Sequence, residues 1–98
     1  MGSGFESQAT HQKMHTVYAL HNEDRDKIYI GRTTNLQKRM LRHNGVLPNK
    51  RTSYTQRNSG VWEVVYTEEI GDAREAGRRE KQLKSYRGRK FIRTLIRK

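Results

Sequence analysis

The sequence has no cysteine, a single proline and no long apolar segment. Without cysteine the chain forms neither disulfides nor thiolate zinc sites, which suits a reducing compartment. No apolar run approaches the roughly 20 residues that a membrane-spanning helix needs, and no signal-peptide pattern is present. We therefore expect an intracellular protein, cytoplasmic or nuclear, without a membrane segment.

Acidic residues are scarce as well. The 98 residues include 21 Lys and Arg but only 10 Asp and Glu, giving a formal net charge of +11, and no acid occurs in residues 32–62 or 81–98. Such acid-free basic segments favour a polyanion partner, because each neutralised phosphate releases counterions. We expect nucleic acid, either DNA or RNA, rather than a membrane surface, since no segment has a basic face opposite exposed bulky apolar residues.

Apolar periodicity predicts one small domain in residues 14–98, preceded by a flexible tail in residues 1–13. The expected order is β-β-α-β-α-α: an α+β fold with a small three-stranded antiparallel sheet flanked by helices. Strands are predicted at 15–21, 27–32 and 61–70, helices at 35–44, 73–86 and 89–97, and a long basic loop at 45–60.

Two capping boxes set the expected starts of the first two helices. Thr34 is followed three residues later by Gln37, and Asp72 by Glu75. The pair Arg87-Gly88 is expected to end the second helix. The predicted inward-facing residues are Leu36, Met40 and Leu41 in the first helix, Ala73, Ala76, Leu83 and Tyr86 in the second, and Phe91, Ile92, Leu95 and Ile96 in the third.

A tyrosine pair marks the predicted hairpin. Centring the hairpin on the polar turn at residues 22–25 places Tyr18 opposite Tyr29 on one face of the sheet. Paired tyrosines on a sheet are more often packing than chemistry, but Gly31 leaves room for a ligand at the strand end. The opposite face is then apolar, formed by Val17, Ala19, Ile28 and Ile30.

Arg39 and His43 lie four residues apart and so project from one side of the first helix, beside its apolar stripe. Two interpretations stay open for the arginine. Its aliphatic part covers apolar surface while the charge stays in water, or its guanidinium binds a phosphate while the imidazole handles protons near neutral pH.

Glu80 falls within the inward stripe of the second helix, where a carboxylate is costly unless it is paired or binds a cation. An ion pair with Lys84 or a contact to Arg79 is the simpler explanation, but neither accounts for the inward position. We therefore predict a metal site with one Mg²⁺ or Mn²⁺ ion, because Mg²⁺ binds through one or two carboxylates and completes its shell with water and substrate phosphate.

Together these residues suit phosphodiester hydrolysis, which needs a base to activate water, a cation to stabilise the transition state and a metal at the leaving oxygen. At these positions the sequence resembles the GIY-YIG nuclease family. Residues 16–18 stand at its first motif and residues 29–31 match its second, with ten residues between the two tyrosines; Arg39 follows eight positions after Gly31. The resemblance covers residues 14–97.

The sequence departs from the family at Thr16, which occupies the place of the name-giving glycine, as in many short bacterial-type members. It is most similar to stand-alone, single-domain members, with some likeness to the nuclease domain of Slx-type resolvases. The resemblance implies a divalent-metal-dependent DNA endonuclease in which Tyr18 generates the nucleophile and Tyr29 positions it, although which tyrosine is the base stays open. It further implies that Arg39 stabilises the pentacovalent phosphate, that His43 assists proton transfer and that Glu80 holds the metal.

Five residues are expected to grip nucleic acid: Arg32, Lys50, Arg51, Tyr54 and Arg57. Tyr54 or Trp62 is suited to stack on a base, with Trp62 favoured as a core residue. We expect a monomer, with a protein partner as one source of specificity and DNA repair as one of several open roles. The alternatives are a catalytically inactive nucleic-acid-binding module and a basic RNA-binding structural protein.

Overall fold

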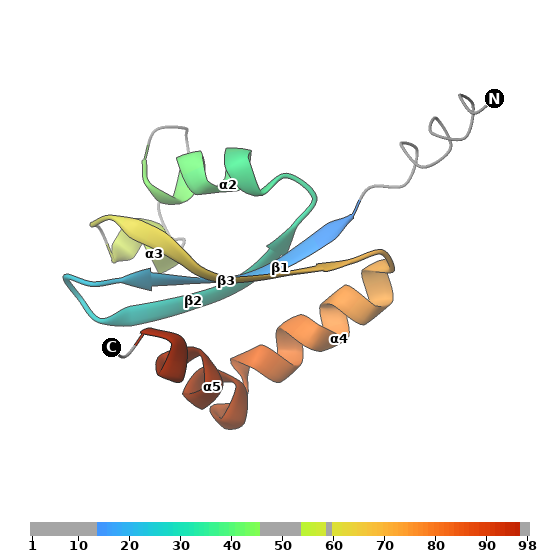
Figure 1. Cartoon of the computed structure of the whole chain (residues 1–98). Coiled ribbons are helices and arrows are strands. Elements are labelled where there is room, and N and C mark those ends of the chain that lie inside the picture. Colours follow the sequence, from blue (N-terminus) through green and yellow to red (C-terminus); the bar gives the residue numbers. More distant parts are fainter. Residues whose placement is uncertain (1–13, 46–53, 59, 97–98) are drawn as a thin grey trace.

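The computed structural model describes residues 14–45, 54–58 and 60–96, so the predicted N-terminal tail, Lys50 and Arg51 lie outside the described residues. The elements in chain order are β1 (His15–Asn22), β2 (Lys27–Thr33), α2 (Leu36–His43), α3 (Tyr54–Arg57), β3 (Trp62–Ile70), α4 (Ala73–Lys84) and α5 (Tyr86–Ile96) (Figure 1). The predicted α+β fold is confirmed, except that the short helix α3 forms within the segment expected to be a loop.

The sheet has the order β2-β1-β3, and both pairs are antiparallel. In the hairpin Tyr18 pairs with Gly31 and Tyr29 with Leu20. The predicted Tyr18–Tyr29 pairing was therefore wrong by two residues, because the turn occupies residues 23–26 and Asp26 takes a left-handed backbone with φ of 53°. A shift of two residues preserves the face of every side chain, so the tyrosines still share one side of the sheet.

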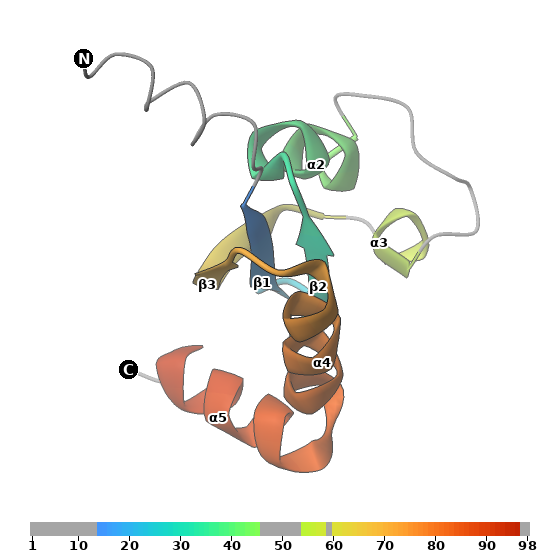
Figure 2. The same cartoon turned by 90° about the vertical axis from the view of Figure 1, so that its right-hand side faces the viewer.

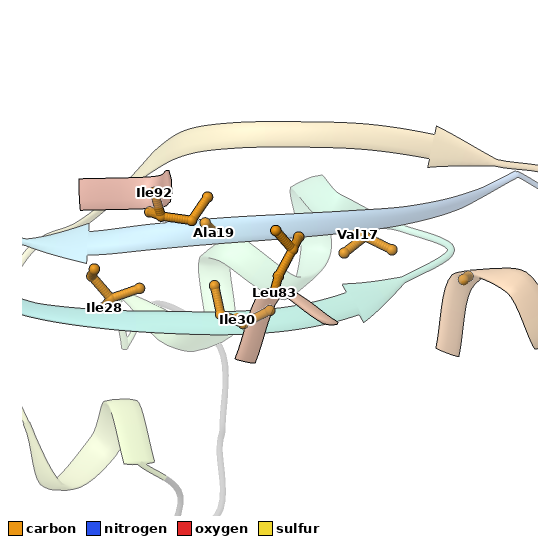
Figure 3. Close-up of a cluster of buried hydrophobic side chains, with 7 residues drawn as sticks. Val17, Ala19, Ile28, Ile30, Leu83 and Ile92 are labelled. Atoms are coloured by element: carbon orange, nitrogen blue, oxygen red, sulfur yellow. The ribbon is translucent and has the colours of Figure 1, made fainter. Parts of the chain in front are cut away.

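Both faces of the sheet are covered by helices. Helices α4 and α5 cover one face and α2 and α3 the other (Figures 1 and 2). The expected alternation along β1 and β2 is confirmed, since odd and even positions of β1 enter different cores. The first core contains Val17, Ala19, Ile28, Ile30, Ala76, Leu83 and Ile92 (Figure 3). The second contains Tyr18, Leu20 and Trp62, packed by Tyr29, Leu36, Met40 and Tyr54.

Helix ends differ from the sequence prediction in two places. The N-cap of α2 is Asn35 rather than Thr34, and its side chain accepts a hydrogen bond from Lys38 N at 3.0 Å. Asp72 caps α4 as predicted, through the backbone N–H of Glu75. Helix α4 ends at Ser85, and Gly88 belongs to α5, where a Cβ would lie 2.3 Å from the Gln82 carbonyl oxygen. The glycine therefore permits close contact between the helices instead of ending one.

Several residues expected to face inward are exposed. Tyr86 has 78% of its surface exposed because it begins α5 just after the turn at Ser85. Ala73 is also exposed, at the start of α4, and Leu41, Phe91 and Leu95 retain about 40% exposure. On α2 the deepest position belongs instead to His43, which is buried. None of the helices in the described ranges is long and apolar enough to cross a membrane.

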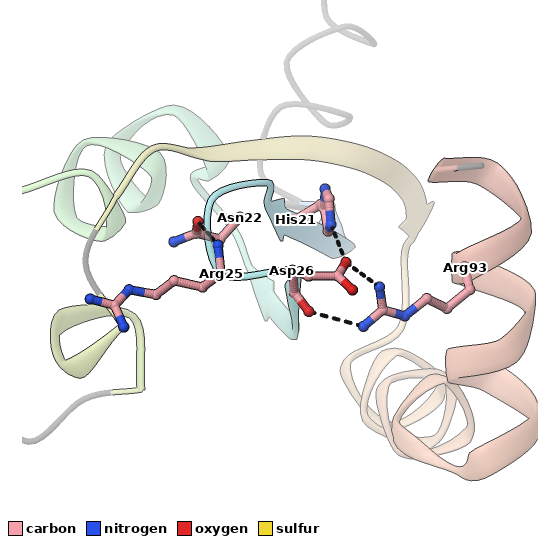
Figure 4. A network of polar contacts seen from close by, with 5 residues as sticks. All are labelled: His21, Asn22, Arg25, Asp26 and Arg93. Atoms are coloured by element: carbon pink, nitrogen blue, oxygen red, sulfur yellow. Dashed lines mark hydrogen bonds and ion pairs between the residues drawn. The ribbon is translucent and has the colours of Figure 1, made fainter. Parts of the chain in front are cut away.

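A polar network ties α5 to the hairpin turn (Figure 4). Asp26 bonds to His21 Nε2 at 3.0 Å and to the Arg93 guanidinium, which also donates to the Asp26 carbonyl oxygen. The hydrogen bond from His21, followed by that from Arg93, lowers the pKa of the Asp26 carboxyl. These contacts fix the turn that sets the hairpin register.

Candidate active site

Three predicted site residues meet beneath α2. Tyr18 is fully buried, and its Oη lies 3.0 Å from His43 Nε2. Half-buried Tyr29 packs on both, with ring centroids 6.1 Å from Tyr18 and 4.8 Å from His43. The hairpin supplies the tyrosines and the C-terminal turn of α2 supplies the imidazole, so two segments distant in sequence form one aromatic and polar cluster.

Thr55 is a further member of this cluster that the sequence analysis missed. It lies in α3, is 2% exposed, and its Oγ1 is 2.9 Å from His43 Nδ1. Both ring nitrogens of His43 are therefore engaged inside the protein. A buried threonine in a polar, non-periodic segment gives no sequence signal, and only the position of α3 beside α2 brings it to the histidine.

Burial keeps the tyrosine and the histidine neutral. Desolvation raises the pKa of Tyr18 to about 12, against an opposing hydrogen bond from Arg39. Desolvation also lowers the pKa of His43 to about 4, and the positive charge of Arg39 adds to that effect. In a neutral imidazole one nitrogen accepts a hydrogen bond and the other donates one. At neutral pH the pair is thus a phenol next to an unprotonated base.

Arg39 adds a donor to this hydrogen-bond chain. Its pKa is raised, mainly by the hydrogen bond to Tyr18. A guanidinium only donates, so the Tyr18 oxygen accepts from Arg39. The distances in the chain Tyr18–His43–Thr55 are compatible with an imidazole that is protonated at Nδ1 and accepts at Nε2, the tautomer that a base at Nε2 requires.

One donor of Arg39 has no hydrogen-bond partner in the part of the chain that the structure describes. This donor is the Nε, which is buried. A buried N–H without a partner costs roughly 1–3 kcal/mol, more for a charged group. Arg39 also lines a basic hollow of about 190 Å³ together with Thr33, Asn35, Lys38 and Arg42. An arginine that borders a basic hollow is suited to binding an anion such as phosphate.

Gly31 is needed where the two tyrosines converge. A Cβ at this position would lie 2.7 Å from Tyr18 Oη and 2.9 Å from Tyr29 Cε2. The space predicted from the sequence beside the strand end is therefore occupied by the tyrosine rings, which approach the backbone because no side chain intervenes. Neither ring has freedom to retreat without disturbing His43.

We predict that Gly31→Ala lowers the free energy of unfolding by about 1–3 kcal/mol, the usual cost of overpacking a core, and reduces any activity of the site. Urea unfolding followed by Trp62 fluorescence measures the first effect. Gly71→Ala is the matched control, since the nearest atom to its Cβ is Met14 Sδ at an ordinary 3.8 Å. Equal stability of the two variants would contradict the proposed packing role.

Glu80 is mostly buried and doubly paired. Its side chain is 19% exposed; Oε1 lies 3.1 Å from Arg32 Nε and Oε2 lies 3.0 Å from Lys84 Nζ. The ion pair with Lys84, the simpler explanation considered from the sequence, therefore exists, whereas Arg79 pairs with Glu68 instead. The charge of Glu80 contributes to the raised pKa of Arg39, which places the carboxylate within electrostatic reach of the tyrosine cluster.

The donor set near Glu80 restricts the kind of metal site. No group of three or more His, Cys, Asp or Glu residues suited to a metal occurs in the part of the chain that the structure describes. A single carboxylate still fits Mg²⁺, which keeps several waters and takes substrate phosphate oxygens. Arg32 and Lys84 are 43% and 50% exposed, and surface ion pairs are worth only about 0–1 kcal/mol, so displacing either from Glu80 costs little.

The described residues that were expected to bind nucleic acid lie on different elements, β2 and α3. Arg32 is held at α4, pairing with Glu80 and donating to the Ala73 carbonyl oxygen. Tyr54 stacks on Tyr29 with centroids 6.2 Å apart, and Arg57 is exposed at the end of α3. Trp62 is 1% exposed, which confirms it as a core residue.

Thr55→Val removes the hydroxyl while keeping the shape of the side chain, and we expect it to slow catalysis at this site about tenfold, the lower end of the effect of removing a hydrogen bond that orients a functional histidine. Thr55→Ser should restore the rate, because it returns the oxygen. Turnover of both variants, with thermal melting to verify folding, gives the comparison. Equal rates for the valine variant and wild type would leave Thr55 a packing residue only.

The fold and the site together form a small α+β domain with a buried phenol–imidazole pair, an arginine beside it and one mostly buried carboxylate. The family model for the GIY-YIG catalytic domain matches residues 14–92, and the chain belongs to the GIY-YIG family. Domains of this family are typically nucleases, hydrolases with nucleic acid as substrate. A search of curated proteins found no match to this chain.

Proposed function

We propose that this chain is a divalent-metal-dependent endonuclease that hydrolyses phosphodiester bonds in DNA. The observation that carries the proposal is the position of Arg39, which lines a basic hollow and interacts with Tyr18, the hydrogen-bond partner of His43. Its Nε is buried without a hydrogen-bond partner among the described residues. An arginine that binds the phosphate would thus lie close to a proton acceptor. Hydrolysis of a phosphodiester requires both at one place.

Glu80 would hold the metal, with water and phosphate oxygens completing the shell. When bound there, a divalent ion supplies positive charge to the leaving 3′ oxygen. In the substrate-free protein, Arg32 and Lys84 compensate the carboxylate instead. Both are partly exposed, so they can turn towards the phosphates of a bound strand when they leave Glu80.

Residues of the chain itself would accept the proton that the attacking water loses. Tyr29 is the tyrosine that an incoming water meets first, because it is half-buried and Tyr18 fully buried. We assign Tyr29 to orient the water and Tyr18 to carry its proton inwards. As the water oxygen bonds to phosphorus and the bond from phosphorus to the 3′ oxygen breaks, the water proton would pass to Tyr18 Oη while the Tyr18 proton passes to His43 Nε2. The departing 3′ oxygen takes a proton from solvent, and His43 later releases its proton to solvent. Thr55 Oγ1, 2.9 Å from Nδ1, would keep Nε2 unprotonated beforehand by accepting a hydrogen bond from Nδ1–H.

Arg39 links substrate binding to the basicity of His43. The guanidinium charge helps to depress the pKa of His43 in the free protein. A phosphodiester anion on Arg39 offsets that charge, so the imidazole becomes a better proton acceptor once substrate is present. The water is then activated mainly when a phosphate is in place to be attacked.

A distinctive pH dependence follows. His43 must be neutral to act, and its pKa is about 4 in the free protein. We expect kcat/KM, which reports the free protein, to show no histidine inflection near neutral pH. The bound phosphate raises the pKa of His43, so the acid limb of kcat should lie at higher pH than that of kcat/KM. Acid limbs that coincide near the ordinary value of 6.5 in both profiles would contradict the coupling.

The proposal is tested by incubating the protein with labelled duplex, single-stranded, overhanging and four-way-junction DNA, in Mg²⁺ and in EDTA. We expect cleavage of at least one member in Mg²⁺ only, leaving 5′-phosphate and 3′-hydroxyl ends, because water attacks phosphorus and the 3′ oxygen departs. A parallel RNA panel decides between the two nucleic acids. Salt-sensitive binding without cleavage would favour the inactive binding module.

A further inference from the structure

A second hollow lies next to the proposed catalytic centre. It has a volume of about 300 Å³ and is lined by Ile28, Tyr29, Ile30, Tyr54, Lys84 and Arg89. Pockets that bind small organic groups have volumes of about 300–1,000 Å³. Four separate elements build it: strand β2, helix α3 above the sheet, and helices α4 and α5 below. We call it the β2 groove.

Strand β2 forms the floor of the groove at an edge of the sheet. In the described part of the chain β2 pairs with β1 alone, and Figure 2 shows α3 and α4 on the side of the sheet where β2 lies. Ile28 and Ile30 are 5% and 2% exposed, so their side chains belong to the core and offer little to a ligand. The features that distinguish the groove therefore come from its aromatic and cationic walls.

The aromatic wall continues the tyrosine cluster outwards. Tyr54 stacks on Tyr29 at an interplanar angle of 27°, and its other contact is edge-on to Trp62. Tyr54 is half-buried and lines the groove. An aromatic ring held rigidly by two others is a suitable platform for a nucleobase, because every base has a π-face.

The opposite wall is cationic. Lys84 and Arg89 line it, and Arg89 Nε donates to the Lys84 carbonyl oxygen at 3.2 Å, which holds the two elements together. Both side chains are exposed, and no acid lies in residues 81–98. Lys84 also joins the groove to the catalytic centre, since its Nζ pairs with Glu80. Tyr29 also joins the groove to the catalytic centre, since it lines the groove and its ring packs on His43.

We infer that the β2 groove binds an unpaired nucleotide of the substrate strand, its base on Tyr54 and its phosphate between Lys84 and Arg89. This inference rests on the proposed function and deepens it. A base within a duplex is stacked and paired and has no free face for Tyr54, whereas a single-stranded nucleotide has one. The chain therefore prefers nucleic acid that is single-stranded next to the cleaved bond.

Binding in EDTA tests this inference without cleavage. Fluorescence anisotropy compares a blunt DNA duplex with the same duplex carrying a short 5′ or 3′ single-stranded extension. We expect wild type to bind one extended form more tightly. Tyr54→Leu should reduce that preference about tenfold, since stacking of one base is commonly worth a factor of this size or more, while Tyr54→Phe retains it.

Arg89→Gln provides a second variant, on α5 in the cationic wall of the groove, which leaves the tyrosine rings unchanged. It should lower the slope of log K against log salt for the extended form by about 0.7, the value for one phosphate contact in a single strand. Arg78→Gln is the matched control on the same molecule, because Arg78 is exposed on α4, pairs with Glu75 and does not line the groove. Thermal melting verifies that every variant is folded.

Three results would overturn the inference: equal wild-type affinity for blunt and extended DNA, an equal loss on both ligands in Tyr54→Leu, or equal salt slopes for Arg89→Gln and Arg78→Gln. Preference for the extended form without cleavage in Mg²⁺ would retain the groove and reject the nuclease. Cleavage in Mg²⁺ without a preference for the extended form would support the nuclease and reject the proposed role of the groove.

Discussion

Arg39→Gln will lower kcat for DNA cleavage by about 10²- to 10³-fold, the usual cost of losing one preorganised donor to a transition-state oxyanion. In the part of the chain that the structure describes, the Nε of this arginine is buried without a hydrogen-bond partner, and we expect the guanidinium to bind a phosphate of the substrate. Stability should change by only about 1 kcal/mol or less, because the loss of the hydrogen bond to Tyr18 is offset by the removal of a buried donor that has no partner among the described residues. Single-turnover cleavage and urea unfolding measure the two effects separately.

Two further variants sharpen this prediction. Arg39→Lys keeps the charge but lacks the planar fork, so we expect it to restore only part of the rate. Arg78→Gln removes an exposed positive charge from α4 and should leave kcat unchanged. If Arg39→Gln cut DNA as fast as Arg78→Gln, the guanidinium would merely cover apolar surface, the alternative considered from the sequence.

Glu80→Gln will reduce cleavage in Mg²⁺ by about 10²-fold or more, because the amide keeps the shape of the side chain but cannot anchor the cation that stabilises the leaving oxygen. The Mg²⁺ concentration for half-maximal rate should also rise. Thermal stability should hardly change, since Arg32 and Lys84 are each more than 40% exposed and remain hydrated without their partner. Cleavage rates across a Mg²⁺ titration measure both effects on catalysis.

Glu75→Gln is the control for this variant. Glu75 is another carboxylate of α4 in an ion pair, with Arg78, but its side chain is 55% exposed on the outer side of the helix. We expect wild-type rates and wild-type Mg²⁺ dependence from it. If Glu80→Gln behaved in the same way, the carboxylate would serve only to join β2 to α4 through Arg32.

Local pattern was sufficient to predict the elements that position the site. Alternating apolar residues predicted both hairpin strands and their faces. The family, which the family model confirms, was indicated by the resemblance at five positions: Tyr18, Tyr29, Arg39, His43 and Glu80. The hairpin register was not predictable in the same way, because it depends on the left-handed backbone of Asp26, which is held by Arg93 from the far end of the chain.

Long-range pairing explains the remaining differences. Thr55 gave no signal, since its contact with His43 depends on how α3 packs against α2. Arg32 was expected to meet nucleic acid, and its pairing with Glu80 joins residues 48 positions apart. The helical period of α4 predicted that the Glu80 carboxylate faces inward. Its pairing with Arg32 could not be predicted, because it depends on how α4 packs against the edge strand β2.

The most direct test of the account is cleavage of a labelled DNA panel by the wild-type chain, in Mg²⁺ and in EDTA, with binding to the same DNA recorded alongside. The account predicts fragments with 5′-phosphate ends in Mg²⁺ and intact, bound DNA in EDTA. Bound DNA that stays intact in Mg²⁺ and in Mn²⁺, across every member of the panel, would contradict it.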